Sequence, residues 1–504
     1  MYIGVDCGTQ STKVIVLDSA SRQIVGEASV AHQLIQADNG RREQNPADWI
    51  AAFEQALAAA LKKANVPASE VKGIGISGQQ HGMVALDKDG HPVHPAKLWC
   101  DTESSHENAQ LLEQLGGPKG SLERLGIVLQ TGYTASKIAW LRHHEPEAYS
   151  RIDLILLPHD YLNFYLTGER VTEAGDASGT GYFDTRSRQW SRETFAMVAP
   201  ELDPDKVLPR VIESHQPAGT VLPIVSERLG LGRDVIVSSG GGDNMMAAIG
   251  TGNILPDIMT ISLGTSGTLF TASDHPVVSP DGLAANFCSS TGGWLPLICT
   301  MNATSATTQI RNLLGLDLNE FNRVAAEATP GAGGITLLPF FNGERVPPLP
   351  DATASCVGMS SYNTTPGNMA RAALEGATYG LKFGFDAMLS AGKEAPRRIR
   401  LVGGGAKSPL WRQLVSDIMN CELVCPQNSE SAALGGALQA IWCRGGLEGS
   451  STSLEHLCRD AVTLDETTRT RPQDDNVRRY GDLYQIYLET LHERYPALPG
   501  NPRV

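Results

Sequence analysis

The sequence predicts an α/β fold of two domains, with mixed sheets covered by helices, on three observations. The chain has 504 residues, which is more than one ordinary hydrophobic core accommodates. Strand-like and helix-like runs alternate along most of its length. A short turn motif of glycine and hydroxyl residues occurs at 8–12 and again at 264–268, some 256 positions later. This repeat indicates a duplicated domain, and we expect domains at 1–245 and 246–504.

The first half is expected to open with a β-hairpin. Apolar, β-prone runs at 2–6 and 13–17 flank the first turn. After a strand at 23–30, Asn45 and Pro46 supply an N-cap and a first helical residue for a helix through 49–61. The remaining expected elements are strands at 71–77 and 235–237 and a helix at 136–143, and the half ends in Gly240-Gly241-Gly242-Asp243.

The second half is expected to repeat this plan. Its hairpin has strands at 259–263 and 269–271 around the second turn. Periodicity predicts helices at 303–314, 318–328, 368–389, 409–419, 432–442 and 478–494, and strands at 335–340, 398–402 and 422–424. The polar stretch at 450–475 carries only a weak pattern.

Composition narrows the classes of partner. The chain is 41% hydrophobic and 19% charged, as globular proteins are, and its net charge of −14 argues against nucleic acid or an anionic membrane as the main partner. The sequence begins directly with a strand-like run and contains no long apolar run, so we expect no signal segment and no membrane span. Its nine scattered cysteines predict neither a disulfide framework nor a structural metal site, which fits a cytoplasmic protein.

The two turns are the main candidates for phosphate binding. Glycine lets backbone N–H groups converge on an anion, and serine and threonine hydroxyls add donors. One such turn is common in hairpins, whereas two suggest that paired domains hold one polyphosphate from both sides.

Two aspartates accompany these turns. Asp6 ends the first strand, where its carboxylate suits Mg²⁺ beside bound phosphates, or alternatively an ordinary Asx-turn. Asp243 follows three glycines, whose missing Cβ atoms would let a substrate hydroxyl reach its carboxylate as a general base. A plain helix N-cap is an equal alternative for Asp243.

Other glycine-rich segments are less specific. The run from Gly403 to Ser408 lacks the glycines of a Walker motif, but it suits close approach of a nucleobase or, equally, a tight connection. The formal dinucleotide motif at 73–78 is rejected because no helix start follows it.

A polar set with an aromatic neighbour offers a candidate polyol site. Gln80 and His81 lie between Gly78 and Gly82, where hydroxyl binding and a satisfied turn histidine are equally open. Trp99 and Asp101 offer an aromatic wall and a hydroxyl acceptor, or, for the tryptophan, simple core packing.

Together these segments resemble the FGGY family of carbohydrate kinases nearly from end to end. The matching segments are 6–11, 78–82, 99–101, 240–244, 263–267, 343–347 and 403–406. The resemblance implies two domains with an actin-like, RNase H-type core and a deep cleft between them. It implies ATP-dependent phosphorylation of a sugar, with Asp243 as base and Asp6 acting through Mg²⁺.

The resemblance also implies individual binding residues. ATP phosphates would contact Gly8, Thr9, Gln10, Ser11, Gly264, Thr265 and Ser266, and adenosine would lie near Gly404, Gly405 and Ser408. Gln80, His81, Trp99, Asp101, Asp243 and Asn244 would form the sugar site. The expected reaction is phosphorylation of a ketopentose at its terminal hydroxyl, with D-xylulose the first candidate.

Several alternatives stay open at this stage. Glu103 stands where similar kinases often have arginine, and Gln80 where methionine is common, so D-ribulose, L-ribulose, glycerol or gluconate are alternative substrates. A nucleotide-dependent switch on an actin-like scaffold is the alternative from another class. The expected partner is a small sugar, and a homodimer is the assembly considered.

Overall fold

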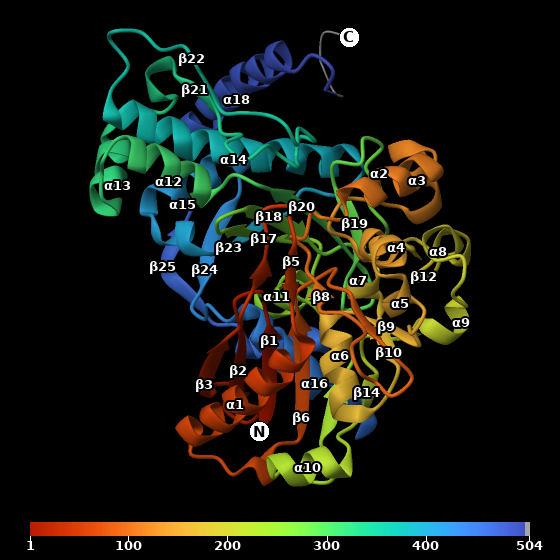
Figure 1. Cartoon of the computed structure of the whole chain (residues 1–504). Helices are drawn as coiled ribbons and strands as arrows, with labels where there is room; N and C mark the ends of the chain where they lie inside the picture. The colour runs from red at the N-terminus through yellow and green to blue at the C-terminus, as the bar shows by residue number, and fades with distance from the viewer. Residues whose placement is uncertain (499–504) are drawn as a thin grey trace.

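The computed structural model describes residues 1–498 and consists of two lobes, each built on a seven-stranded sheet (Figure 1). The first sheet has the order β14-β15-β6-β1-β2-β3, and β16 also pairs with β6. Its strands are β1 (Tyr2–Cys7), β2 (Ser11–Leu17), β3 (Ile24–Ala31), β6 (Gly73–Gly78), β14 (Pro217–Thr220), β15 (Ile236–Ser238) and β16 (Gly241–Gly242).

The second sheet has the order β19-β20-β18-β17-β23-β24-β25. Its strands are β17 (Ile258–Leu263), β18 (Gly267–Thr271), β19 (Ala285–Cys288), β20 (Trp294–Thr300), β23 (Arg398–Val402), β24 (Glu422–Pro426) and β25 (Leu464–Thr470). In each sheet an antiparallel pair leads into strands that run parallel, β1-β6-β15 in one and β17-β23-β24 in the other. The shared plan confirms the two-domain α/β prediction and the duplication.

Helices cover these sheets where the sequence places apolar faces. In the first lobe, Asn45 caps α1 (Pro46–Ala64) by accepting a hydrogen bond from Ala47 N (3.2 Å), as predicted. The second lobe carries α12 (Thr304–Leu313), α13 (Leu318–Glu327), α14 (Pro366–Ser390), α15 (Pro409–Met419) and α18 (Asp474–Arg494). Segments that join or flank the first sheet form α2 (Ser105–Gln114), α3 (Gly117–Leu125), α4 (Thr134–His144), α5 (Pro146–Tyr149), α6 (Pro158–Thr167), α8 (Arg192–Val198), α9 (Pro204–Val207) and α10 (Pro223–Leu229).

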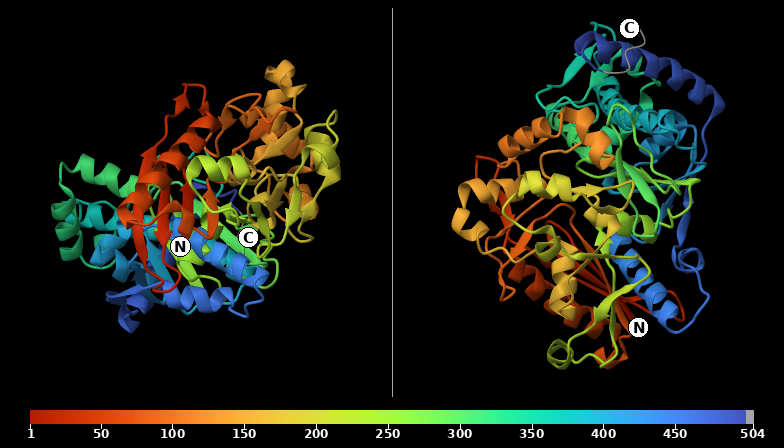
Figure 2. Two further views of the ribbon diagram at one scale, coloured as in Figure 1. Left: turned by 90° about the horizontal axis from the view of Figure 1, so that it is seen from below. Right: turned by 90° about the vertical axis from the view of Figure 1, so that its right-hand side faces the viewer.

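One helix from the second half of the chain packs on the first sheet. α16 (Ser431–Leu447) contacts β1, β6 and α11 (Asp243–Gly250), and Figure 2 shows this blue helix beside the red strands. Glycines permit the contact: a Cβ on Gly75 would lie 1.9 Å from Gly436 O, and one on Gly435 would lie 1.9 Å from Met246 O. The expected boundary at 245 falls inside α11, between β16 and β17, where one sheet ends and the next begins.

Two sequence expectations differ from the structure. The stretch 450–475 contains α17 (Leu454–Ala461) as well as β25, the edge strand of the second sheet. The strand expected at 335–340 is shorter, β21 (Thr336–Leu338), and pairs with β22 (Ser355–Val357).

All nine cysteines are free thiols, and within residues 1–498 no helix is long and apolar enough to cross a membrane.

Candidate active site

A cavity of about 280 Å³ is lined by residues of both lobes. The chain before α11 and α11 itself contribute Gln80, His81, Trp99, Gln130, Thr131, Gly132, Tyr133, Asp243 and Asn244. The second lobe contributes Ser262, Ser266, Thr268, Leu283, Ala285, Phe287, Leu297, Cys299, Arg345 and Val346. Both lobes therefore supply polar and apolar side chains to the wall, which suits a small polyol.

Strand register brings the first phosphate turn, Asp6 and Asp243 to one edge of the first sheet. Cys7 and Gly78 are paired residues of parallel β1 and β6, and Gly242 pairs with Gly78 from the other side. Because these strands end together, the turn at 8–10, Gln80 and Asp243 all follow them at the same edge. This is the carboxyl edge of a parallel sheet, where ligands bind in open α/β folds.

The second turn occupies the equivalent edge of the second sheet. Gly264, Thr265 and Ser266 connect β17 to β18. The backbone N–H groups of residues 303–305, at the start of α12, bond to carbonyl oxygens of Gly264 and Thr265 at 2.9–3.2 Å, which fixes the turn. A Cβ on Gly403 would lie 2.7 Å from the Leu263 carbonyl, so the 403–405 segment passes close beside this turn.

The expected adenosine residues lie beyond the cavity. Gly404 has open space where a Cβ would point, and Ser408 caps α15 through a hydrogen bond from Trp411 N (3.4 Å). The Ser408 hydroxyl also donates to Asn322 Oδ1 (3.1 Å). None of these residues lines the cavity, and their position next to the second turn suits the far end of a nucleotide whose phosphates reach that turn.

Asp243 is the first residue of α11, and Gly242 occupies the N-cap position. Its carboxylate accepts hydrogen bonds from Asn244 N (2.7 Å) and Asn244 Nδ2 (3.0 Å). The same Asn244 amide donates to Gln80 Oε1 (2.9 Å), so three of the expected sugar residues form one hydrogen-bonded group. Burial, with the nearby Asp6 carboxylate, raises the pKa of Asp243 to about 7.

Asp6 accepts a hydrogen bond from the Ser77 hydroxyl (3.1 Å). Burial raises the pKa of Asp6 to about 6, and the charges of Asp6 and Asp243 interact unfavourably. Two carboxylates that each disfavour the ionised form of the other suit a divalent cation between or beside them.

His81 has a strained backbone, with φ of 64°. Its carbonyl oxygen accepts hydrogen bonds from Lys137 Nζ (2.5 Å) and the Thr134 hydroxyl (3.2 Å). Its ring lies 4.6 Å from the Tyr133 ring and 5.7 Å from the Phe287 ring, centroid to centroid. Burial and the Lys137 charge hold the pKa of His81 well below its usual value, so the imidazole is neutral and can both donate and accept.

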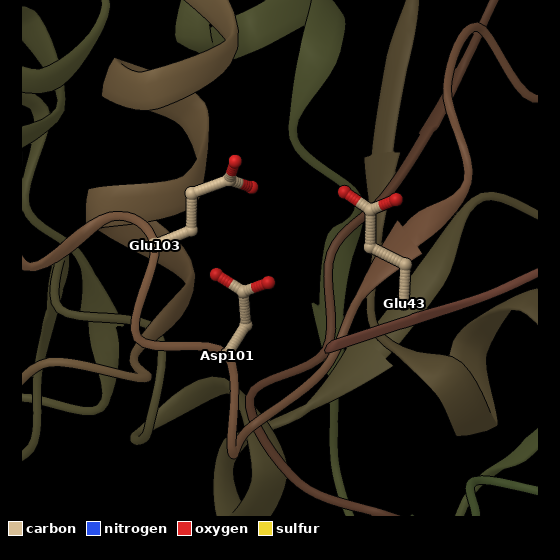
Figure 3. Close-up of side chains that lie close together, drawn as sticks. All are labelled: Glu43, Asp101 and Glu103. Atoms are coloured by element: carbon tan, nitrogen blue, oxygen red, sulfur yellow. The ribbon is translucent and has the colours of Figure 1, made fainter. Parts of the chain in front are cut away.

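Asp101 does not reach the cavity. Its carboxylate accepts a hydrogen bond from Arg42 N (2.7 Å) and lies beside those of Glu43 and Glu103, as Figure 3 shows. Lys97 Nζ lies 2.9 Å from Glu43, 3.5 Å from Asp101 and 2.5 Å from Glu103. The ammonium thus occupies the place that a metal ion would take among these carboxylates. The geometry gives no support to Asp101 as a sugar contact, and Glu103 faces Lys97 in the same cluster.

Sequence reasoning assigned no role to several lining residues. Arg345 belongs to a segment that carried the family resemblance, and it gives the second lobe's wall a fixed positive charge. Tyr133 and Phe287 enclose the His81 ring, but nothing in their sequence surroundings distinguishes them from core aromatics. Only the fold brings them together.

Two successive parts of the chain match one family. Residues 1–250 match the N-terminal domain of the FGGY family of carbohydrate kinases, and residues 259–443 match its C-terminal domain. The chain belongs to this family, which confirms the resemblance seen in the sequence and sets aside the switch-protein alternative. It is therefore a carbohydrate kinase.

Individual relatives cover nearly the whole chain. The chain is 52% identical over 499 residues to the xylulose kinase of Haemophilus influenzae, covering 98% of this chain and 100% of that protein. Its structure is similar to that of a xylulose kinase from Bifidobacterium adolescentis, with a TM-score of 0.83, 31% identity, and coverage of 97% and 99%. A kinase structure from Brucella ovis, titled xyloylose kinase, has a TM-score of 0.89, 29% identity, and coverage of 98% and 99%.

Proposed function

We propose that this kinase transfers the γ-phosphoryl group of ATP to the terminal hydroxyl of D-xylulose, giving D-xylulose 5-phosphate. The observation that carries the proposal is the cavity in which Asp243 and the polar group Gln80–Asn244 face the second phosphate turn. The full-length relatives named xylulose kinase support the choice of sugar. D-ribulose and other polyols are the competing substrates that an assay must compare.

Asp243 is the proposed general base. The sugar hydroxyl would donate its hydrogen bond to the Asp243 carboxylate, and its oxygen would attack the γ-phosphorus in line with the departing ADP oxygen. The hydroxyl proton passes to Asp243 as the new P–O bond forms and the bond to ADP breaks. Asn244 holds the carboxylate by two hydrogen bonds, so orientation is set before the substrate arrives.

The turns are the proposed phosphate cradle, with backbone N–H groups at 9–11 and 264–266 as donors, since Gly8 N closes the first turn on Ser11 O (3.1 Å). These donors are held by hairpin geometry, so they need no reorganisation as charge moves onto the leaving group. Their place at equivalent edges of two sheets lets closure of the lobes bring both onto one triphosphate and exclude water. Gly404, Gly405 and Ser408 would flank the adenosine.

Asp6 is the proposed residue for Mg²⁺, because its carboxylate lies near enough to that of Asp243 for the two charges to repel. The ion would supply positive charge to the phosphate oxygens. Gln80 and His81 would bind sugar hydroxyls, and the indole of Trp99 would contact the sugar's apolar face.

The test is ADP release measured with D-xylulose, D-ribulose, L-ribulose, L-xylulose, glycerol and gluconate. The proposal expects kcat/KM to be highest for D-xylulose by at least about tenfold, the discrimination that one misplaced hydroxyl partner produces. A higher value for another sugar, or ADP release that no sugar stimulates, would contradict it.

A further inference from the structure

A continuous chain of side-chain hydrogen bonds joins the core of the first lobe to the cavity wall. Trp49 Nε1 bonds to Gln44 Oε1 (2.9 Å), and Gln79 Nε2 bonds to the same oxygen (3.1 Å). The Thr9 hydroxyl bonds to Gln79 Oε1 (3.0 Å), and Trp99 Nε1 bonds to that hydroxyl (2.9 Å). We call these five residues the indole-to-indole chain.

The two indoles fix the direction of every bond in this chain. An indole N–H only donates, so Gln44 must present its oxygen to Trp49 and its NH₂ to the carbonyl of Thr9 (2.7 Å). Gln79 then turns its NH₂ to Gln44 and its oxygen to Thr9. The Thr9 hydroxyl must donate to that oxygen, because its own oxygen receives the N–H of Trp99. No other arrangement of amides and protons satisfies all five groups.

The Thr9 hydroxyl therefore has no free proton for a phosphate, which leaves only the backbone N–H of Thr9 as a donor. Its hydroxyl and its carbonyl are both used within the chain, although the residue stands in the first phosphate turn. The hydrogen bonds from Gln44 to the Thr9 carbonyl and from the Thr9 hydroxyl to Gln79 fix the backbone of the turn at Thr9. Both glutamines are 1% exposed.

Only one end of the chain is open. Trp49 is fully buried, whereas Trp99 is 36% exposed and lines the cavity where the sugar is proposed to bind. A ligand that packs on the Trp99 indole restricts the most exposed indole of the chain, and this restriction acts directly on the Thr9 hydroxyl to which the indole is bonded. When a first ligand has already ordered these protein groups, binding of a second ligand costs less conformational entropy of the protein. Each ligand therefore binds more tightly in the presence of the other.

We propose that the indole-to-indole chain couples sugar binding to nucleotide binding, with Thr9 as a positioning residue that transmits the state of Trp99 to the first phosphate turn. The inference rests on the proposed function, since it takes the sugar to contact Trp99 and the triphosphate to contact the turn at 8–11.

The experiment measures the coupling by titration calorimetry. The dissociation constant of D-xylulose is determined alone and with a saturating non-hydrolysable ATP analogue and Mg²⁺, and the ratio is the coupling factor. The wild type is expected to bind the sugar more tightly with the analogue. Trp99→Phe removes the bond between Trp99 and Thr9, and Thr9→Val removes that bond together with the one from Thr9 to Gln79. Each variant should reduce the factor by at least roughly three- to tenfold, the value of one neutral hydrogen bond.

Three further variants separate coupling from general damage. Because Thr9→Val already breaks the bond that Trp99→Phe removes, the double variant should reduce the factor no more than Thr9→Val alone. Thr9→Ser keeps the hydroxyl and should restore the factor to within about twofold of the wild type. Trp190→Phe is the matched control, because its indole bonds to Pro209 O (2.9 Å) away from the cavity and should leave the factor unchanged.

The possible results are distinguishable. A wild-type factor of one, a factor unchanged in Thr9→Val and Trp99→Phe, or additive losses in the double variant would overturn the inference and leave the proposed function standing. Failure of the wild type to bind D-xylulose would contradict the proposed function and the inference together. Thermal melting of each variant confirms that the folded protein is compared, and the exposed position of Trp99 makes its variant the safer of the two.

Discussion

The proposed general base, Asp243, predicts that a single ionisation governs the rate, at a pH set by the surroundings of this carboxyl group. A carboxyl base must be deprotonated to accept the sugar proton, so activity rises with pH through its pKa. Burial and the nearby Asp6 charge raise the pKa of Asp243 to about 7. The ionised fraction is then about one-tenth at pH 6 and about nine-tenths at pH 8, which predicts a rise of roughly ninefold. An ordinary aspartate would show no change over this range.

The assay is the initial rate of ADP release from pH 5.5 to 8.5 with both substrates well below their KM, which reports the free enzyme. Asp243→Asn keeps the size of the side chain, removes the ionisation, and should lower the rate by roughly 10²- to 10⁴-fold with a flat profile. Binding of the ATP analogue should persist. A wild-type rate that is constant between pH 6 and 8, or an Asn variant within about tenfold of wild type, would refute this reasoning.

Three further predictions concern residues that support the site. Lys137→Met removes a buried amine donor from the His81 carbonyl and should raise the KM for the sugar roughly tenfold or more, with a smaller change in kcat. An unchanged KM would argue against this support. Gly435→Ala in α16 places a Cβ 1.9 Å from a backbone oxygen of α11 and should lower the melting temperature. Gly446→Ala in the same helix meets nothing within 4 Å and should raise the melting temperature slightly. Equal melting temperatures for the two variants would contradict the packing argument. Lys97→Met leaves Asp101 and Glu103 without an ion-pair partner among residues 1–498, while Glu43 keeps Arg41. It should lower the free energy of unfolding in urea by about 3–5 kcal/mol, and a loss below about 1 kcal/mol would show that the cluster is effectively solvated.

Local signals in the sequence predict much of the fold. Each hairpin is encoded by β-prone runs around a glycine-and-hydroxyl turn, and the helix after Asn45 by its cap and proline. These signals act within a few residues, so no knowledge of distant contacts is needed. Asp6, Gln80 and Asp243 lie together at the carboxyl edge of the first sheet because they stand at or just after the ends of strands that run parallel.

Long-range pairing accounts for what the sequence does not reveal. Trp99 and Asp101 are two residues apart, yet the former reaches the cavity and the latter is held by Lys97 and Arg42. Strand β5 (Arg42–Gln44) pairs with β8 (Ala96–Lys97) and places Glu43 opposite Lys97. The sequence around Asp101 contains no signal that predicts this pairing or the cluster that results from it. The packing of α16 on the opposite lobe depends likewise on glycines in separate segments.

A crystal structure of the protein with D-xylulose, Mg²⁺ and a non-hydrolysable ATP analogue tests the central claim most directly. The account predicts that the terminal sugar oxygen lies within about 2.6–3.2 Å of the Asp243 carboxylate and in line with the γ-phosphorus. It also predicts that backbone N–H groups of both turns, at 9–11 and at 264–266, contact the same triphosphate. A triphosphate held by one turn alone, or a sugar bound away from Asp243, would contradict it.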